Sequence, residues 1–197
     1  WVPDYLYAGC YFSVSAVQLI SLLALAGVRI PKPNLTRTGG RPLGVFFRNP
    51  LFVVGMTCSA IGYALMSYLM TATPLQVVNV AQLGTSANAT IIQWHVVAMF
   101  APSFFTGDLI QRLGIIKILL VGLLAYIVAM ITALAGDQLL HYFVALFLVG
   151  LGWNFLYIGG SALVASVATA EEKGRVQGVA DLATTSLVAL ASLSAGG

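Results

Sequence analysis

Long apolar segments alternate with short polar ones along the chain, and this pattern is the first guide to its structure. Six segments are apolar enough to cross a membrane: Tyr7–Val28, Leu51–Val78, Thr90–Thr106, Ile115–Ala135, Tyr142–Ala168 and Val176–Gly197. A helix rises about 1.5 Å per residue, so about 20 residues cross the roughly 30 Å hydrocarbon core of a bilayer. The pattern therefore predicts six transmembrane helices.

Helices explain these segments better than strands do. Each segment is continuously apolar, whereas a membrane barrel strand alternates apolar and polar residues over about ten positions. Hydrophobic residues make up 59% of the 197-residue chain and charged residues only 8%, a balance that a soluble fold of this size is unable to bury. We therefore expect an all-α integral membrane protein whose solvent is the lipid bilayer.

The positive charges lie in alternate connections between the apolar segments. The first, third and fifth connections hold all nine cations: Arg29, Lys32, Arg37, Arg41, Arg48, Arg112, Lys117, Lys173 and Arg175. The positive-inside rule places this side in the cytoplasm, so both ends of the chain are expected outside it. Because the cations form no continuous stripe, the net charge of +3 does not indicate nucleic-acid binding.

Proline and glycine mark three special places. Residues 29–50 contain four prolines and a glycine pair, so we expect an irregular, mobile linker there. The turn at residues 136–138 is short enough to make the fourth and fifth segments antiparallel neighbours. Pro74, near the end of the second segment, lacks a backbone donor, so it either breaks the helix along a solute path or is a tolerated kink.

Aromatic and amide residues in mid-membrane are candidates for a solute cavity. Trp153 and Tyr157 are one helical turn apart with Asn154 beside them, a surface suited to an uncharged or amphipathic solute. A comparable stripe on the second segment and one polar residue on the third add Tyr63, Met66, Ser67, Met70 and Gln93. The alternative is that these residues serve only packing, as do the nearby glycines Gly150, Gly152, Gly159 and Gly160.

Two ionisable residues are candidates for proton coupling. His95 on the third segment either exchanges a proton near neutral pH or is a neutral residue that donates to a neighbouring carbonyl or glutamine. Asp181 is expected about one turn into the sixth helix, where either a transport role or the helix macrodipole would account for its charge. Every Lys and Arg is in a connection, which argues against a multiply anionic solute.

Enzymatic chemistry finds little support in the sequence. The chain has two histidines and six acidic residues without metal-ligand spacing, and it lacks nucleophile-elbow, zinc-site and phosphate-loop motifs. Cys10 and Cys58 lie inside apolar segments and are expected to pack as small hydrophobic residues. We expect no catalytic site, no metal and no cofactor.

Residues 107–117 resemble the loop signature of the major facilitator superfamily. In that signature a glycine is followed four residues later by an acid, then by an arginine, a further glycine and basic residues. Four positions fit: Gly107, Arg112, Gly114 and Lys117. Gln111 stands where the acid usually does, and Asp108 offers a carboxylate three residues earlier. Residues 70–75, 93–95, 99–107 and 152–155 are likewise similar to bacterial permeases of the superfamily.

The resemblance implies part of a twelve-helix bundle that moves a small solute by proton-coupled alternating access. Residues 1–28 would be the last helix of the N-terminal half, 29–50 the cytoplasmic linker, and 51–197 most of the C-terminal half. The six segments would then be helices six to eleven, in a bacterial inner membrane, with the missing helices as partners. The degenerate signature leaves open a non-transporting scaffold or assembly subunit with the same fold. The start without Met and the apolar end likewise favour a piece of a longer protein.

Overall fold

The computed structural model describes residues 8–29 and 40–195, and every regular element in these ranges is helical. The elements are α1 (Ala8–Ala26), α2 (Leu43–Phe47), α3 (Pro50–Leu75), the π-helical turn η1 (Gln76–Val80), α4 (Gly84–Phe100), α5 (Ser103–Leu113), α6 (Ile115–Leu134), α7 (Leu139–Ser166) and α8 (Lys173–Ser194). Five helices are long and apolar enough to cross a membrane, and α4 with α5 forms a sixth, bent candidate. The predicted all-α fold with six spans is confirmed in these ranges.

The chain forms two compact units, residues 1–39 and residues 40–197. In the first unit, α1 is an apolar helix of 19 residues. Its two serines bond to carbonyls four residues earlier, Ser13 to Gly9 O at 2.8 Å and Ser21 to Val17 O at 2.9 Å. Neither hydroxyl therefore requires another partner inside a bilayer, where unpaired polar groups are costly.

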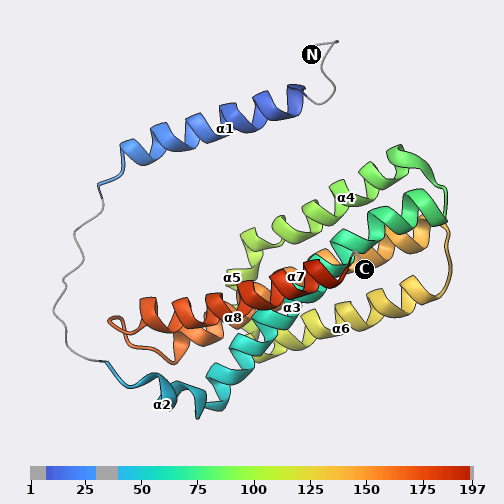
Figure 1. Ribbon diagram of the computed structural model, residues 1–197. Coiled ribbons are helices and arrows are strands. Elements are labelled where there is room, and N and C mark those ends of the chain that lie inside the picture. The colour runs from blue at the N-terminus through green and yellow to red at the C-terminus, as the bar shows by residue number, and fades with distance from the viewer. Residues whose placement is uncertain (1–7, 30–39, 196–197) are drawn as a thin grey trace. The chain divides into compact units, whose positions relative to one another are not determined.

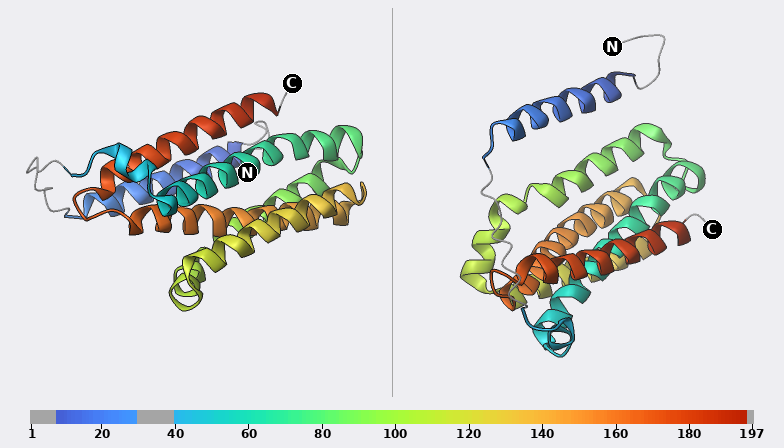
Figure 2. Two further views of the ribbon diagram at one scale, coloured as in Figure 1. Left: turned by 90° about the horizontal axis from the view of Figure 1, so that it is seen from below. Right: turned by 60° about the vertical axis from the view of Figure 1, so that its left-hand side comes forward.

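In the second unit α7 runs through the middle, and α3, α4 and α6 pack around it (Figure 1 and Figure 2). Glycines make these contacts close. A Cβ on Gly160 of α7 would lie 2.5 Å from the carbonyl oxygen of Gly55 on α3, and a Cβ on Gly150 would lie 2.6 Å from the carbonyl oxygen of His95 on α4. The sequence prediction that these glycines permit close packing is confirmed.

The connection between α6 and α7 is as short as predicted, and the two helices pack against each other. Gly152 of α7 faces Gly122 of α6, where a Cβ on Gly152 would lie 3.0 Å from the opposite carbonyl oxygen. Tyr126 on α6 also donates a hydrogen bond of 2.7 Å to the carbonyl of Gly62 on α3. These contacts tie α3, α6 and α7 into one core.

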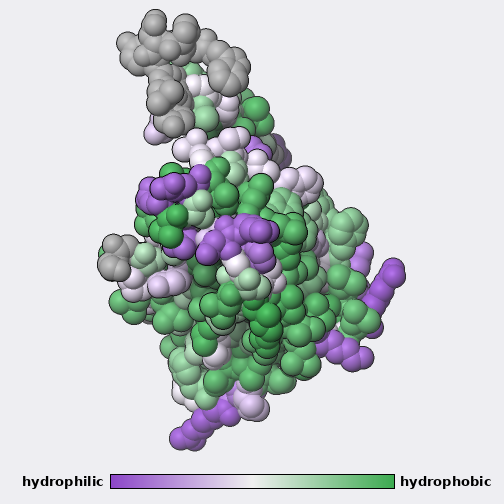
Figure 3. All heavy atoms as spheres, turned by 90° about the vertical axis from the view of Figure 1, so that its right-hand side faces the viewer, coloured by the Kyte–Doolittle hydropathy of each residue, from purple (hydrophilic) through white to green (hydrophobic). Residues whose placement is uncertain are grey.

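The outside of the bundle suits lipid. Large apolar residues such as Leu120, Ile131 and Leu134 are more than half exposed on α6. Figure 3 shows hydrophobic side chains over most of the face that it presents, with the polar residues gathered in a few patches. In a bilayer these flanks meet hydrocarbon rather than water, so the exposed apolar surface is expected rather than anomalous.

The structure settles three points about the predicted helices. The third span does not follow the predicted bounds Thr90–Thr106, because α4 starts at Gly84 and ends at Phe100, and α5 continues at an angle of 42°. Of the two alternatives at Pro74, a break does not occur: α3 continues to Leu75 and only its winding changes, to the π form, at η1. Gln76 N–H there is shared between the carbonyls of residues 72 and 73.

The third point is a correction of the linker predicted at residues 29–50. Its last part contains the short helix α2, and Phe46 on this helix is 1% exposed, in a cluster with Phe52 and Val176. Residues 40–50 are therefore an ordered part of the second unit. Residues 30–39, which include Lys32 and Arg37, lie outside the described ranges.

Candidate functional site

Four aromatic rings meet where α3, α4 and α7 come together. Trp153 and Tyr157 on α7 are stacked, with ring centroids 5.2 Å apart and planes 12° apart. Tyr63 on α3 lies edge-on to both, at 5.4 Å from Trp153 and 5.2 Å from Tyr157. Phe100, at the end of α4, lies edge-on to Trp153 at 5.8 Å. Offset and edge-to-face pairs at these distances are the favourable arrangements of aromatic side chains.

This ring cluster, defined as Tyr63, Phe100, Trp153 and Tyr157, is only partly covered. Trp153 is 6% exposed, Tyr63 and Tyr157 are half-buried, and Phe100 is 55% exposed. The indole N–H of Trp153 is buried and has no hydrogen-bond partner among the described residues. The cluster therefore combines partly exposed rings with one buried donor that has no partner in the described ranges.

The structure brings together five of the eight predicted cavity residues. Met66 and Met70 pack in the same hydrophobic cluster as Tyr63, Trp153 and Tyr157. Gln93 is exposed on α4, and no hydrogen bond or ring contact in residues 40–195 joins it to the ring cluster. The sequence prediction does not include Phe100, although its place two residues before Pro102 marks it as the end of a helix.

Asn154 lies next to Trp153 but points to a different partner. Its side chain is 0% exposed, and its amide nitrogen donates to the carbonyl of Met99 and to the hydroxyl of Ser103, both at 2.6 Å. Its amide oxygen accepts a hydrogen bond of 2.6 Å from the hydroxyl of Thr106. All of its hydrogen-bonding groups are thus used by the segment between α4 and α5, and none faces the ring cluster's open side.

His95 is fully buried between α4 and α7. Its Nδ1 lies 2.7 Å from the carbonyl oxygen of Leu146, and because a carbonyl only accepts, Nδ1 carries the proton. This is the contact that the packing interpretation of His95 predicts. Nε2 is buried without a partner in the described ranges, so proton exchange there would require a path that opens from outside.

Asp181 differs from its predicted setting. The sequence predicts that the sixth helix starts at Val176, but α8 starts at Lys173, so Asp181 lies more than two turns inside it. The macrodipole acts mainly within the first turn and no longer explains the charge. Asp181 is exposed, while Gln177 one turn earlier bonds to the hydroxyl of Ser161 on α7 at 3.1 Å.

A charged pair that the sequence does not predict lies outside the spans. Arg41 donates to Glu172 from Nη2 at 2.7 Å, from Nε at 3.0 Å and from its backbone N–H at 2.8 Å. Thr169 N–H adds a hydrogen bond of 3.0 Å to the same carboxylate. The hydrogen bonds from Arg41, followed by those from the backbone, hold the pKa of Glu172 far below its ordinary value, and the pair raises the pKa of Arg41.

The loop signature is only partly a loop. Gly107, Asp108 and Arg112 lie on α5, Gly114 separates α5 from α6, and Lys117 is in the first turn of α6. The prediction of a loop over residues 107–117 is therefore wrong for most of its length. Gly114 has φ = 88°, a left-handed conformation that favours glycine, and this is where the chain reverses.

A cavity of about 560 Å³ lies elsewhere, between α3, α6 and α7. Its lining is mainly aliphatic, for example Leu65, Leu69, Leu123 and Met130. Leu65 and Leu69 are on the opposite face of α3 from Tyr63 and Met70. None of the predicted cavity residues lines it. We place the candidate site at the ring cluster instead, because there several aromatic faces lie next to a buried donor without a partner in the described ranges.

Metal chemistry has no candidate site in the described ranges, where no group of three or more His, Cys, Asp or Glu residues is placed to hold an ion. The two cysteines, Cys10 and Cys58, are free. The candidate site is therefore a set of aromatic rings among apolar helices, an arrangement suited to binding a flat solute.

Comparison with known proteins gives consistent matches. A family model described as the Major Facilitator Superfamily matches residues 4–192. The chain is 42% identical to a riboflavin transporter of Brucella anthropi, over 99% of this chain and 50% of that protein. It is 32% and 28% identical to two uncharacterized MFS-type transporters of Bacillus subtilis, YdeG and YddS, over 73% and 78% of this chain.

The chain spans about half the length of the riboflavin transporter, and the matches cover 33% and 36% of the two Bacillus proteins. No solved structure matches the chain significantly. Since the matching family and the named relatives are transporters, the prediction that the chain is not an enzyme is confirmed.

Proposed function

The chain belongs to the Major Facilitator Superfamily, and from this premise we propose that it is part of a longer transporter for a small, planar aromatic solute of the riboflavin type. The observation that carries the proposal is the ring cluster, in which three helices present aromatic faces at one place. The riboflavin transporter that shares 42% of the residues supports the choice of solute.

The chemistry of riboflavin fits the ring cluster. Its isoalloxazine is a flat, uncharged ring system with carbonyl oxygens and ring nitrogens along one edge. Such a ring stacks on exposed aromatic faces, and the buried N–H of Trp153 supplies a donor for an acceptor on its edge. A solute that gives this donor a partner gains affinity, because an unpaired buried donor is unfavourable.

The charge distribution supports a neutral solute. In the described part of the chain every Lys and Arg lies outside the middle of a span, so no cation faces the ring cluster. Asp181 on α8 is the one carboxylate that lies deep within a described span. A carboxylate there can accept hydrogen bonds from solute hydroxyls, and it is also our candidate for proton coupling.

Of the two coupling candidates, Asp181 is favoured over His95. Asp181 is exposed, so it can take up and release a proton as access alternates between the two sides of the membrane. His95 is fully buried, and its Nδ1 proton is bonded to Leu146. We assign His95 to the packing of α4 on α7 and Asp181 to coupling.

The proposed placement follows the family. Residues 1–28 are the last helix of the N-terminal half, 29–50 link the halves, and 51–197 form most of the C-terminal half. The described cations of the second unit lie next to the start of α3, at the junction of α5 and α6, and at the start of α8. These helix ends lie on one side of the unit (Figure 1), which we place in the cytoplasm of a bacterial cell, with the protein in the inner membrane. Rocking of the two halves about the ring cluster then gives alternating access.

The test is riboflavin flux in inverted and right-side-out membrane vesicles that contain the full-length protein, with and without an imposed pH gradient. The proposal expects riboflavin to move only in vesicles with the protein, and the flux to respond to the gradient. If no flux of riboflavin or of other flat heterocycles appears with or without the pH gradient, the proposal fails. A non-transporting scaffold with the same fold then takes its place.

A further inference from the structure

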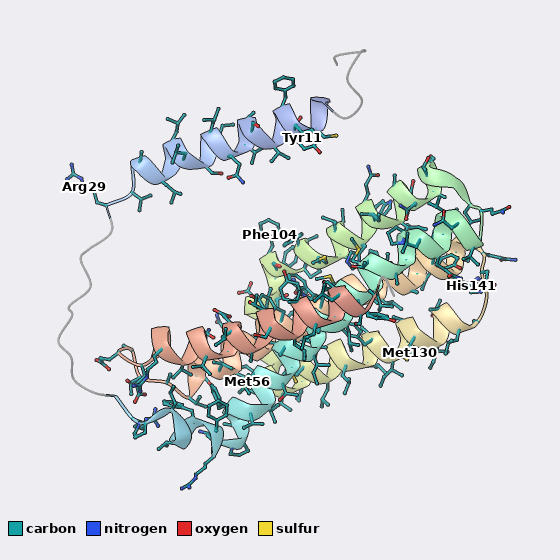
Figure 4. The ribbon with its side chains drawn as sticks, in the orientation of Figure 1. Tyr11, Arg29, Met56, Phe104, Met130 and His141 are labelled. Atoms are coloured by element: carbon teal, nitrogen blue, oxygen red, sulfur yellow. The ribbon has the colours of Figure 1, made fainter. Side chains whose placement is uncertain are left out.

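The bend between α4 and α5 falls within the sixth, bent candidate span. α4 has 17 residues and is therefore about 25 Å long, shorter than the roughly 30 Å hydrocarbon core. α5 continues the span at an angle of 42°, and its apolar side chains Phe104 and Phe105 are 85% and 65% exposed. Figure 4 shows Phe104 pointing away from the bundle. If α4 and α5 cross a bilayer as one span, the backbone at the bend meets lipid and protein rather than water.

The bend leaves carbonyls of α4 without their usual partners. Pro102 has no N–H, so the carbonyl of Ala98 receives no bond from the residue four positions later. The carbonyl of Met99 receives its hydrogen bond from the side chain of Asn154 instead of from the next helical turn. Inside a bilayer a freed backbone carbonyl must find such a partner, because water is not there to supply one.

Asn154 holds both sides of the bend. Its nitrogen bonds to Met99 at the end of α4 and to Ser103 at the start of α5, each at 2.6 Å. Its oxygen lies 2.6 Å from the hydroxyl of Thr106, and the single proton of that hydroxyl is shared with the carbonyl of Pro102 at 2.8 Å. Asn154 and Thr106 are both 0% exposed, so the bonds of Asn154 to Met99 and to Thr106 are shielded from water.

Two functional elements flank the bend. Phe100, immediately before it, lies edge-on to Trp153, and Asn154 is the neighbour of Trp153 in sequence. α5, immediately after it, leads to Arg112 and to the reversal at Gly114. A change in the bend angle therefore moves Phe100 relative to the other rings of the cluster. It also moves the end of α5 that carries Arg112.

We propose that Asn154 is a positioning residue that fixes the bend between α4 and α5 and so keeps Phe100 against Trp153. This assigns Asn154 a role different from lining the cavity: it touches the backbone of the bend, not the solute. The consequence for solute affinity rests on the proposed function, whereas the consequence for the bend rests on the hydrogen bonds alone.

The experiment uses the full-length protein, with spin labels at Gln111 on α5 and Leu140 on α7 in a background without other cysteines. Both side chains are exposed, and neither is among the hydrogen-bond partners of Asn154. Pulsed electron resonance measures the label-to-label distance distribution, and quenching of flavin fluorescence measures riboflavin affinity in the unlabelled protein. The variants are Asn154→Leu, which keeps the branched shape without the amide, Thr106→Val, which removes one hydroxyl, and Thr106→Ser, which keeps it.

Asn154→Leu and Thr106→Val are expected to shift or broaden the distance distribution and to weaken riboflavin binding about tenfold, the effect of one lost aromatic contact. Thr106→Ser is expected to retain the wild-type distance distribution and the wild-type riboflavin affinity. Thr106→Val is the safeguard if Asn154→Leu fails to fold, since it changes a single hydroxyl. If both folded variants keep the wild-type distribution and affinity, the inference is wrong. If the distribution shifts but the wild type binds no riboflavin, the positioning role stands and the proposed solute is wrong.

Discussion

Arg41 and Glu172 are 131 positions apart in the chain, yet their side chains are joined by two hydrogen bonds, the shorter of 2.7 Å. Arg175 also donates to the carbonyl of Arg41, and the guanidinium of Arg41 lies 4.7 Å from the ring centre of Phe46. The pair therefore joins the segment before α3 to the connection between α7 and α8. Gly40 is part of the arrangement, because a Cβ there would lie 2.7 Å from Glu172 Cγ.

This pair predicts a pH-dependent stability. The folded state holds the pKa of Glu172 below its ordinary value of 4.5, so the pair's contribution is complete above that pH and is lost as the pH falls through the lower folded pKa. We expect the unfolding temperature of the wild type to fall on going from about pH 6 to about pH 3.5. Glu172→Gln is expected to lower the unfolding temperature at about pH 6 and to make it less dependent on pH.

The matched control for that measurement is Glu171→Gln. Glu171 is the neighbouring carboxylate, is exposed, and its pKa is lowered by its own backbone and by Thr169 rather than by an arginine. Its replacement is expected to change the pH slope less than Glu172→Gln does. Equal slopes in the two variants would show that the pair with Arg41 contributes nothing specific.

The crossing of α3 and α7 predicts a difference between two glycines. Gly160→Ala places a Cβ against the carbonyl of Gly55, and overpacking of this kind costs about 1–3 kcal/mol. On α8, a Cβ added to Gly178 would meet no atom within 4 Å, so Gly178→Ala is expected to stabilise the helix by about 0.5–1 kcal/mol. Thermal or denaturant unfolding of the two variants in the same detergent gives the comparison, and a stable Gly160→Ala protein would contradict the tight crossing.

The assignment of coupling to Asp181 predicts two different phenotypes. Asp181→Asn keeps the shape without the titratable group, so riboflavin flux is expected to persist while its response to a pH gradient disappears. His95→Gln is expected to leave that response in place and to lower the unfolding temperature instead, because the bond to Leu146 is weakened. Flux measured with and without the gradient separates them, and the reverse pattern would assign coupling to His95.

The sequence was sufficient for the features that depend on hydrophobicity along the chain. All six spans and the short connection between α6 and α7 follow from apolar runs and turn residues. The close packing at Gly150 and Gly160 also follows, since membrane helices approach closely where side chains are small. These features are local in sequence, so no knowledge of the tertiary arrangement was needed.

The features that the sequence does not predict depend on contacts between residues far apart in the chain. Pro102 alone could not show whether the third span bends, because the bend is held by Asn154 from another helix. Lys173 and Arg175 precede the apolar run, so the sequence predicts that the sixth helix starts only at Val176. Because α8 starts at Lys173, Asp181 lies deeper in the helix than predicted. The sequence does not predict the pair of Glu172 with Arg41, because 131 positions separate the two residues.

The central claim is tested most directly by equilibrium binding of riboflavin to the purified full-length protein, followed by flavin fluorescence, in the wild type, Trp153→Leu and Trp94→Leu. Trp94 is the matched control because it packs edge-on to Phe143, outside the ring cluster, and is 48% exposed. Removing a central aromatic contact costs on the order of 2 kcal/mol, so Trp153→Leu is expected to weaken binding by roughly tenfold or more. Trp94→Leu is expected to bind like the wild type. Equal affinities in all three proteins would contradict a solute site at the ring cluster.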